Sequence, residues 1–225
     1  MNDRLLKLIG DKNASKLYTS KILIVGIGGV GGSAIEMIAR SFINNITIVD
    51  YDTFDKSNIN RQILSNINNI NEYKVNEAEK RILSINDKCN IVKYNKKVDK
   101  DFLDSLEPCY DYIIDACDDV NAKILLIKYA IKNNIKIISC MGTGNKINPE
   151  MLKISNIWKT NYDPLAKKIR YLLRKEKIKY KLPVVYSDEK PILKTNGYVA
   201  SISTVPNAAG IFLASYVIND ILKEM

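Results

Sequence analysis

Short apolar runs alternate along the first two thirds of the chain with segments whose apolar residues recur at helical spacing. Each run resembles a buried strand, and a helical segment follows each one, which favours a parallel sheet with helices on both faces. The sequence therefore predicts an α/β fold with a doubly wound, mostly parallel sheet. The predicted strands are Ile22–Val25, Ile46–Val49, Ile91–Tyr94, Tyr112–Ile114 and Lys136–Ser139, and helices are predicted after Gly31 and at Lys74–Ile85, Phe102–Leu106 and Asn121–Asn133.

A glycine-rich turn, GIGGVGG, follows the first predicted strand. Glycines let the backbone bend sharply and approach a phosphate closely, and the helix that follows offers unpaired N–H groups. Asp50 ends the second strand about twenty residues further on, where Rossmann-like folds place a ribose-binding carboxylate. The turn alone could serve packing, but together with Asp50 it predicts a nucleotide site.

The segment after the second strand carries polar groups toward the same edge of the sheet. Asn58, Asn60, Arg61 and Gln62 lie in it. NAD has no terminal triphosphate, whereas an enzyme that attacks the α-phosphorus of ATP must neutralise departing pyrophosphate. A planar, permanently charged guanidinium suits that task. Arg61 therefore favours ATP over NAD.

Lys74 lies in the first turn of the predicted helix Lys74–Ile85. The positive end of the helix dipole disfavours a lysine there unless an anion lies nearby. A phosphate group would supply that anion, so we expect Lys74 to contact ATP. A plain exposed lysine is the alternative.

Carboxylates gather after the fourth predicted strand, at Asp115, Asp118 and Asp119. The end of this strand faces the same crevice as the glycine turn, where Mg²⁺ bridges phosphate oxygens. Asp119 is suited to cap the following helix, and we expect Asp115 to be mainly structural. The neighbouring carboxylates are expected to raise the pKa of the Cys117 thiol, which argues against a nucleophilic role.

Several stretches resemble a known superfamily. GIGGVGG, DYDTFDKSNINRQ and DACDD are similar to the ATP-adenylating, ThiF/MoeB-like fold shared by ubiquitin-activating enzymes and the bacterial sulfur-carrier adenylyltransferases of thiamin and molybdopterin synthesis. MGTGNKINP, YDPLAKKIR and SISTVPNAAGIFLAS resemble the branch of the tRNA threonylcarbamoyladenosine dehydratases. The resemblance implies ATP-dependent dehydration of the threonylcarbamoyl group on the adenosine beside the tRNA anticodon, through an acyl-adenylate of the threonyl carboxylate.

The resemblance also implies roles for individual residues. Arg61, Lys74 and Asp118 are implied to be catalytic, and Asp118 to hold Mg²⁺. A homodimer is implied, in which Arg4 reaches the ATP of the other subunit; a cysteine desulfurase or a sulfur acceptor is a candidate accessory protein. The implied nucleotide-binding residues are Gly26, Gly28, Gly29, Gly31, Asp50, Asp52, Asn58, Arg61, Gln62, Lys74, Asp118 and Arg4.

Two alternatives remain open. Adenylation of the C-terminal glycine of a ubiquitin-like sulfur carrier is the first, but those relatives usually carry paired zinc cysteines or a catalytic cysteine. The cysteines here are widely spaced and form no CxxC pair, which also favours a reducing cytoplasm. A nucleotide-binding scaffold or an NAD oxidoreductase is the second, and Arg61, Lys74 and Asp118 argue against it. The cysteines are Cys89, Cys109, Cys117 and Cys140.

The formal net charge of +9 favours a polyanionic partner, although a generally Lys-rich composition would give the same charge. Asp163 and Pro164 predict the start of a helix over Leu165–Lys177. Basic and aromatic residues interleave there, as on a surface that binds RNA phosphates and bases; a solvated helix face is the alternative. They are Lys167, Lys168, Arg170, Arg174, Lys175, Lys177, Lys179 and Lys181, with Tyr162, Tyr171, Tyr180 and Tyr186.

The remaining features concern the loop Cys140–Pro149 and the two ends. The loop could clamp either a substrate carboxylate or a monovalent cation. The N-terminus lacks the apolar core of a signal peptide, and a short helix is expected within Asp3–Leu17. A link from Tyr198 to Pro206 is expected to lead to a last helix, Ala208–Leu222. This segment is predicted to be a buried helix that is too short to span a bilayer. We expect an ATP-binding domain over 1–150, where the strand–helix alternation ends, and a helical/β extension over 151–225.

Overall fold

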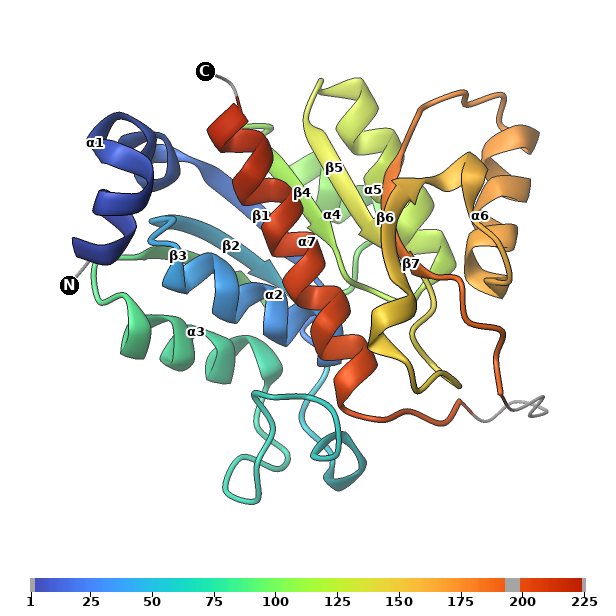
Figure 1. The fold of residues 1–225 in the computed structure, drawn as a ribbon, viewed down its shortest axis with the longest axis horizontal. Helices are drawn as coiled ribbons and strands as arrows, with labels where there is room; N and C mark the ends of the chain where they lie inside the picture. The colour runs from blue at the N-terminus through green and yellow to red at the C-terminus, as the bar shows by residue number, and fades with distance from the viewer. Residues whose placement is uncertain (1–2, 193–198, 224–225) are drawn as a thin grey trace.

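A mostly parallel sheet forms the centre of the computed structural model, which describes residues 3–192 and 199–223. Its strands are β1 (Lys21–Val25), β2 (Asn45–Val49), β3 (Asn90–Tyr94), β4 (Tyr112–Asp115), β5 (Lys136–Cys140), β6 (Leu152–Asn156) and β7 (Pro183–Ser187). The order is β3-β2-β1-β4-β5-β7-β6 (Figure 1). All neighbours are parallel except β6 and β7. The predicted fold class is confirmed.

Helices cover both faces of this sheet (Figure 1). One face carries α2 (Gly29–Arg40), α3 (Lys74–Ile85) and α7 (Thr204–Lys223), and the other carries α4 (Lys100–Ser105), α5 (Val120–Lys132) and α6 (Pro164–Lys175). Single 3₁₀ turns lie at η1 (Lys56–Asn58), η2 (Pro149–Met151) and η3 (Ile157–Lys159). The helices predicted from the sequence agree with these to within a few residues.

Side chains of β1 alternate between two apolar cores. Ile22 and Ile24 pack in the core under α2 and α7, whereas Leu23 and Val25 pack in the core under α5. A strand covered on both faces is apolar throughout. This double burial explains why the central strands were visible as continuous apolar runs.

The N-terminal segment forms α1 (Asp3–Thr19), which is interrupted at Gly10. Gly10 has φ 76° and ψ 161°, a backbone conformation that is essentially confined to glycine. Ala14 and Leu17 after the kink are buried. The short helix expected here is therefore confirmed, with a turn at Gly10 that changes its direction.

The chain beyond Met151 differs from the expectation that strand–helix alternation ends there. β7 pairs in parallel with β5, and β6 pairs antiparallel with β7, so the extension continues the same sheet. β6 escaped prediction because it is a five-residue edge strand with only two apolar residues, Leu152 and Ile154, which is too short an alternation to mark a strand. β7 has the same length as β1 and four buried residues, so its apolar run was an available signal that the sequence analysis passed over.

α7 packs along α2 at close range. A Cβ added to Gly210 would lie 2.1 Å from the carbonyl oxygen of Val30, so glycine is required for this contact. By length and composition α7 could cross a membrane, and the expectation that it is too short was wrong. Its packing against α2 matches the predicted buried helix. Tyr198, where the predicted link to this helix begins, lies outside the described residues.

Candidate functional site

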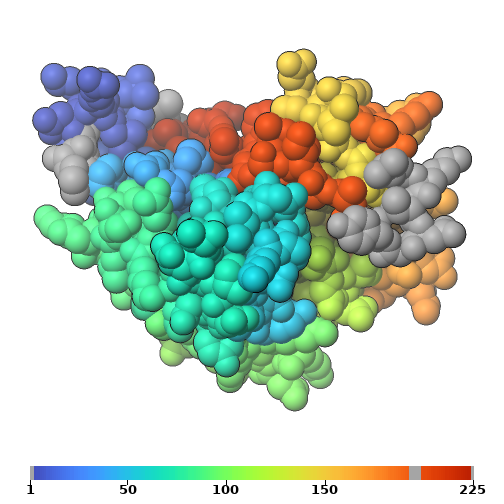
Figure 2. All heavy atoms as spheres, turned by 90° about the horizontal axis from the view of Figure 1, so that it is seen from below, coloured from blue at the N-terminus to red at the C-terminus, as the bar shows by residue number. Residues whose placement is uncertain are grey.

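A cleft of about 660 Å³ opens at the carboxyl ends of the strands. The chain leaves β1 toward β2 on one side and β4 toward β5 on the other. Such a switch point is where open α/β sheets bind ligands. Figure 2 looks onto this side of the molecule and shows the 56–73 loop, in cyan to teal, beside the orange-red start of α7.

The cleft brings together most of the residues singled out from the sequence. Arg4 and Gly31 do not line it, and Arg4 is exposed on α1, which lies at one end of the face in Figure 2. The predicted residues that line the cleft are Gly26, Gly28, Gly29, Asp50, Asp52, Asn58, Arg61, Gln62, Lys74 and Asp118.

The glycine turn is shaped by close backbone contacts. Gly26 has φ 89°, and a Cβ there would lie 2.8 Å from the backbone of Ala116. A Cβ on Gly31 would lie 1.7 Å from the Gly26 carbonyl oxygen, so Gly31 serves packing of the turn. Gly28 precedes α2 without a side-chain cap. The first N–H groups of α2 are therefore available to an anion.

Asp50 is buried beside the turn. One carboxylate oxygen accepts a hydrogen bond from the N–H of Ile27 (2.6 Å) and the other from that of Asp52 (2.8 Å). Burial raises the pKa of Asp50, against the opposing charge of Lys74. Each oxygen retains a second lone pair, so the carboxylate can hold the turn and also accept a ribose hydroxyl.

Lys74 is buried at the start of α3, and its Nζ lies 3.0 Å from Oδ2 of Asp52. The sequence predicted an anion near this end of the helix, and the carboxylate of Asp52 is one such anion. Both side chains line the cleft. The pair lies where it can meet a phosphate or its metal ion.

Arg61 and its neighbours form the lip of the cleft. Nη1 of Arg61 donates to the carbonyl oxygen of Ser57 (2.8 Å) and to Oδ1 of Asn60 (2.9 Å). Within the described residues, the other N–H groups of the guanidinium make no hydrogen bond. Oδ1 of Asn58 accepts from the N–H of Asp55 and completes a capping box. The loop thus presents a fixed guanidinium to the cleft.

Gln62 has an unsatisfied atom. Its side chain is 6% exposed, and Oε1 has no hydrogen-bond partner among the described residues. Buried amide oxygens are nearly always paired, so this atom marks a place for a ligand or water. Gln62 lies near the glycine turn, with Nε2 3.9 Å from a Cβ built on Gly28.

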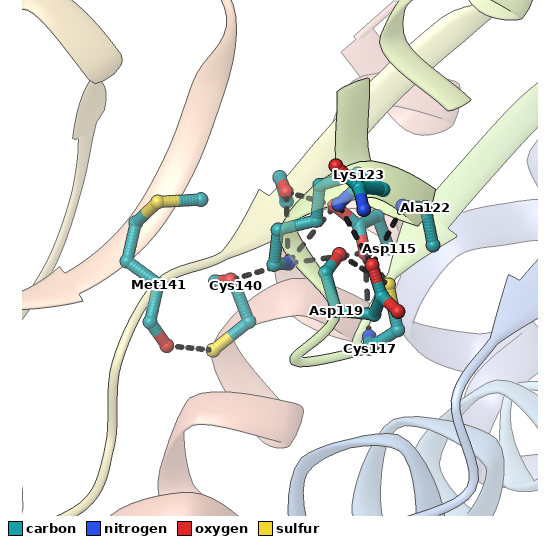
Figure 3. Close-up of polar contacts among 9 residues, drawn as sticks. Asp115, Cys117, Asp119, Ala122, Lys123, Cys140 and Met141 are labelled. Atoms are coloured by element: carbon teal, nitrogen blue, oxygen red, sulfur yellow. Dashed lines mark hydrogen bonds and ion pairs between the residues drawn. The ribbon is translucent and has the colours of Figure 1, made fainter. Parts of the chain in front are cut away.

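The three carboxylates at the end of β4 and just after it have different roles; Figure 3 shows Asp115 and Asp119. Asp115 is fully buried and pairs with Lys123 at 3.0 Å. Asp119 accepts from the N–H groups of Asn121 and Ala122 and caps α5. Both roles were expected. Asp118 alone of the three is exposed, and it lines the cleft.

Cys117 lies between these groups (Figure 3). Burial, followed by the charge of Asp115, raises the pKa of its thiol well above the ordinary value. Sγ lies 3.0 Å from Oδ1 of Asp115. The thiol therefore remains protonated, as expected from its flanking carboxylates.

No three Cys, Asp or Glu side chains of the described residues are grouped as a metal cage. Mg²⁺ commonly binds through one or two carboxylates together with substrate phosphates and water. Asp118, exposed on the cleft wall, fits that mode of binding.

Sequence reasoning missed part of the cleft. Lys97 lies just after β3, with Nζ 5.9 Å from the ring centroid of Tyr51 and 3.5 Å from Oδ2 of Asp119. Its place at the carboxyl end of a strand was the available signal. Val199 and Pro206 also line the cleft, and only the folded chain brings them there.

The basic segment around α6 is partly structural. Nη1 of Arg170 donates to carbonyl oxygens of Ile157 and Thr160, and the guanidinium of Arg174 lies 5.5 Å from the ring centroid of Trp158. Tyr186 is buried. The expectation that all of these side chains form one RNA-binding surface was therefore wrong. Those that remain exposed are Lys167, Lys168, Arg174, Lys175, Lys177, Lys179, Lys181, Tyr162 and Tyr171.

Comparison with known proteins agrees with the fold and the cleft. Residues 2–160 match the ThiF family. The chain is 35% identical to the tRNA threonylcarbamoyladenosine dehydratase of Bacillus subtilis, over 96% of this chain and 92% of that protein. The corresponding Haemophilus influenzae protein is 32% identical, over 97% and 92%.

A solved structure extends the likeness to three dimensions. The Escherichia coli tRNA N6-threonylcarbamoyladenosine dehydratase in complex with AMP superposes with a TM-score of 0.93 at 30% identity, covering 99% of this chain and 94% of that one. The complex with ATP gives a TM-score of 0.91 at 30% identity, covering 99% and 93%. The chain therefore belongs to the ThiF family, and within it to the family of the tRNA threonylcarbamoyladenosine dehydratases.

Proposed function

We propose that this protein uses ATP to dehydrate the threonylcarbamoyl group on the adenosine beside the tRNA anticodon. The observation that carries the proposal is the cleft, which gathers Arg61, Lys74 and Asp118 around one glycine turn. The fold matches that of the E. coli dehydratase, which was solved with AMP and with ATP. An ATP-using, adenylate-forming enzyme accounts for both.

The proposed reaction has two steps. An oxygen of the threonyl carboxylate attacks the α-phosphorus of ATP, and the bond from that phosphorus to the bridging oxygen breaks, which releases pyrophosphate. The ureido oxygen then attacks the acyl carbon, AMP leaves with the carboxylate oxygen, and the ureido nitrogen loses a proton. The ring closes with net loss of one water. Both steps need positioning and charge stabilisation rather than a strong base, which suits a chain with no histidine.

The proposed roles follow the places of the side chains. Arg61 neutralises the departing pyrophosphate, Lys74 contacts the phosphates, and Asp50 accepts ribose hydroxyls. Asp118 would hold Mg²⁺, which neutralises phosphate charge when bound. The remaining nucleotide contacts are assigned to Gly26, Gly28, Gly29, Asp52, Asn58 and Gln62.

The partners follow from the substrate. A tRNA would contact the exposed lysines of α6, since phosphate contacts supply most of the affinity for nucleic acid. A homodimer with Arg4 acting across the interface remains part of the proposal, as do a cytoplasmic location and accessory proteins of sulfur transfer. Residues 1–150 form the proposed ATP-binding part and 151–225 the extension.

Mass spectrometry of the modified nucleoside tests the function. The protein is incubated with tRNA bearing linear threonylcarbamoyladenosine, ATP and Mg²⁺, and the gently digested nucleoside is weighed. We expect a product lighter by one water, absent with Arg61→Ala. Lys56→Ala is the matched control, because Lys56 is an exposed cation of the same loop that does not line the cleft.

Two outcomes would contradict the proposal. An unchanged nucleoside with ATP still bound would favour the other activity of the superfamily, adenylation of a ubiquitin-like sulfur carrier. Thermal stabilisation by NAD but not by ATP would contradict the assignment of the phosphate site itself.

A further inference from the structure

Two buried lysines hold the loop that forms the far end of the cleft. Nζ of Lys123 donates to the carbonyl oxygen of Cys140 at 2.8 Å (Figure 3), and Nζ of Lys146 donates to that of Gly142, also at 2.8 Å. The side chains are 0% and 1% exposed. Met141, between the two held carbonyls, lines the cleft with Gly142.

Lys146 connects three parts of the fold. Its Nζ also donates to the carbonyl oxygen of Ser187 at the end of β7 (3.4 Å) and lies 3.5 Å from Oδ2 of Asp163. Oδ1 of Asp163 caps α6 through the N–H of Ala166. Oδ2 accepts no hydrogen bond within the described residues, so its contact with Lys146 is electrostatic.

The distal part of the loop is fixed independently. The carboxylate of Glu189 accepts from the N–H groups of Ile147 and Asn148, and the N–H of Asn145 donates to the carbonyl oxygen of Ala200 at 2.7 Å. These contacts leave only the short segment 142–144 between the anchored points. Its position therefore depends on Lys146 from one side and Asn145 from the other.

Segment 142–144 has donors to spare. Within the described residues, no hydrogen bond uses the N–H groups of Gly142, Thr143 or Gly144, and all three residues line the cleft. Successive backbone N–H groups in a turn form a concave binding site for an anion. This end of the cleft lies after β5, on the other side of the glycine turn from Asp50 after β2.

A buried lysine–aspartate pair is weak evidence for stability. The desolvation of both charges often cancels their attraction, so apolar side chains of similar volume would serve the fold as well. Lys146 does not line the cleft, and its ammonium is directed to backbone oxygens and Asp163. We therefore attribute the charge of Lys146 to its role in fixing the loop through the Gly142 carbonyl oxygen.

We propose that Lys146 is a positioning residue. Its ammonium group, held by Asp163, fixes the Gly142 carbonyl so that the N–H groups of residues 142–144 receive the carboxylate that is to be adenylated. The inference rests on the proposed function, since it assigns this end of the cleft to the carboxylate substrate. The inference also favours a carboxylate over a monovalent cation as the ligand of this loop. The Gly142 carbonyl oxygen, which could bind a metal cation, already accepts a hydrogen bond from the ammonium group of Lys146.

Lys146→Met is the first test, because methionine fills similar volume without the charge. We expect the Kd for ATP to stay within about twofold, since the nucleotide contacts lie elsewhere, and kcat with saturating tRNA to fall roughly tenfold to hundredfold. Lys153→Met is the matched control. Lys153 lies on β6, pairs with Asp188, is 58% exposed and does not line the cleft, so the kcat of this variant should be unchanged.

Chemical rescue separates positioning from a merely structural role. Lys146→Ala leaves room beside Asp163 and the two carbonyl oxygens, so added ammonium or methylammonium should restore kcat in a saturable manner. The same salts should not restore Arg61→Ala. A folded Lys146→Met enzyme with wild-type kcat would overturn the positioning role of Lys146 and leave the proposed function intact. The positioning role would also be overturned if Lys146→Ala lost kcat together with a lower Tm and weaker ATP binding, and if the added amines did not restore kcat.

Wild-type protein provides the remaining comparison. If it binds ATP but leaves the linear nucleoside unchanged, the proposed function is overturned, and the assignment of this loop to a carboxylate substrate falls with it. If wild type is active and both Lys146 variants match it, only the positioning role is lost.

Discussion

Nζ of Lys74 lies 3.0 Å from Oδ2 of Asp52, yet the two side chains differ in exposure, 7% for the lysine and 47% for the aspartate. The ammonium is held in place by the fold, while its partner faces the cleft. A buried lysine at a helix start is costly unless anions surround it. We infer that the cleft keeps this charge ready for a second anion, the phosphates of ATP.

Lys74→Met should therefore weaken ATP binding. We expect the Kd measured by calorimetry to rise roughly tenfold, which corresponds to about 1.4 kcal/mol. Lys80→Met is the control, because Lys80 lies on the same helix, is 70% exposed and pairs with Glu77 away from the cleft. Equal affinities for the two variants would contradict the role of Lys74.

Gly26→Ala should destabilise the protein severely. The backbone there has φ 89°, and the added Cβ would lie 2.8 Å from the backbone of Ala116. Strain and overlap together predict a loss of roughly 2–5 kcal/mol in the free energy of unfolding, measured with urea. Gly10→Ala isolates the strain, because Gly10 has φ 76° but nothing within 4 Å of its Cβ position. Gly10→Ala should cost less, and the reverse order would refute the packing argument.

The central fold could be predicted because its signals are local. Ile22–Val25 is apolar on both faces, and the cap formed by Asp119 needs only the residues that follow it. The edge strand β6 has only two apolar residues, Leu152 and Ile154, and only Leu152 is buried, so its alternation is too short to mark a strand. Its pairing with β7 becomes evident only in the folded chain.

The cleft was predictable for a different reason. Parallel strands end at one edge, so residues just after Val25, Val49 and Asp115 had to meet there. The buried lysines could not be found in this way. Lys146 stood out only as one polar residue of the loop Cys140–Pro149, and Lys123 was not singled out. Their partners Asp163 and Cys140 become neighbours only through the tertiary fold.

The thiols provide a test against a catalytic cysteine. Burial raises the pKa of Cys89 to about 11 and that of Cys140 to about 12, and it raises the pKa of Cys117 well above the ordinary value. A thiol reacts as the thiolate, so iodoacetamide at about pH 8 should label the exposed Cys109 first. Peptide mass spectrometry gives the order, and all four should react in urea. Fast labelling of native Cys117 would favour sulfur-transfer chemistry.

Asp50 should make stability depend on pH in an unusual direction. Burial raises its pKa in the folded state, so its contribution is fully present below the unfolded value near 3.8 and is lost as the pH rises through the folded value. Relative to Asp50→Asn, the wild type should therefore lose stability as the pH rises from about 4 to 7. Urea titrations of both proteins measure this difference.

Asp119 supplies the control of opposite sign. The backbone N–H of Ala122 is the main cause that lowers its pKa, so its contribution appears above the unfolded value and is lost as the pH falls. The wild type should therefore gain stability relative to Asp119→Asn as the pH rises from about 2 to 4.5, and the difference should stay nearly level from there to pH 7. Parallel slopes for the Asp50 and Asp119 comparisons would contradict the burial argument.

Arg4 lies on α1 away from the cleft, so any role in ATP binding requires a second subunit. Arg4→Ala and Arg61→Ala should each be nearly inactive alone. In a mixed dimer, however, the cleft of the Arg4→Ala subunit keeps its own Arg61 and receives an intact Arg4 from the other chain. Random mixing should restore about a quarter of wild-type activity, because half of the dimers are mixed and each holds one complete cleft. Wild-type ATP affinity in Arg4→Ala, or no recovery on mixing folded subunits, would exclude the action of Arg4 across the interface.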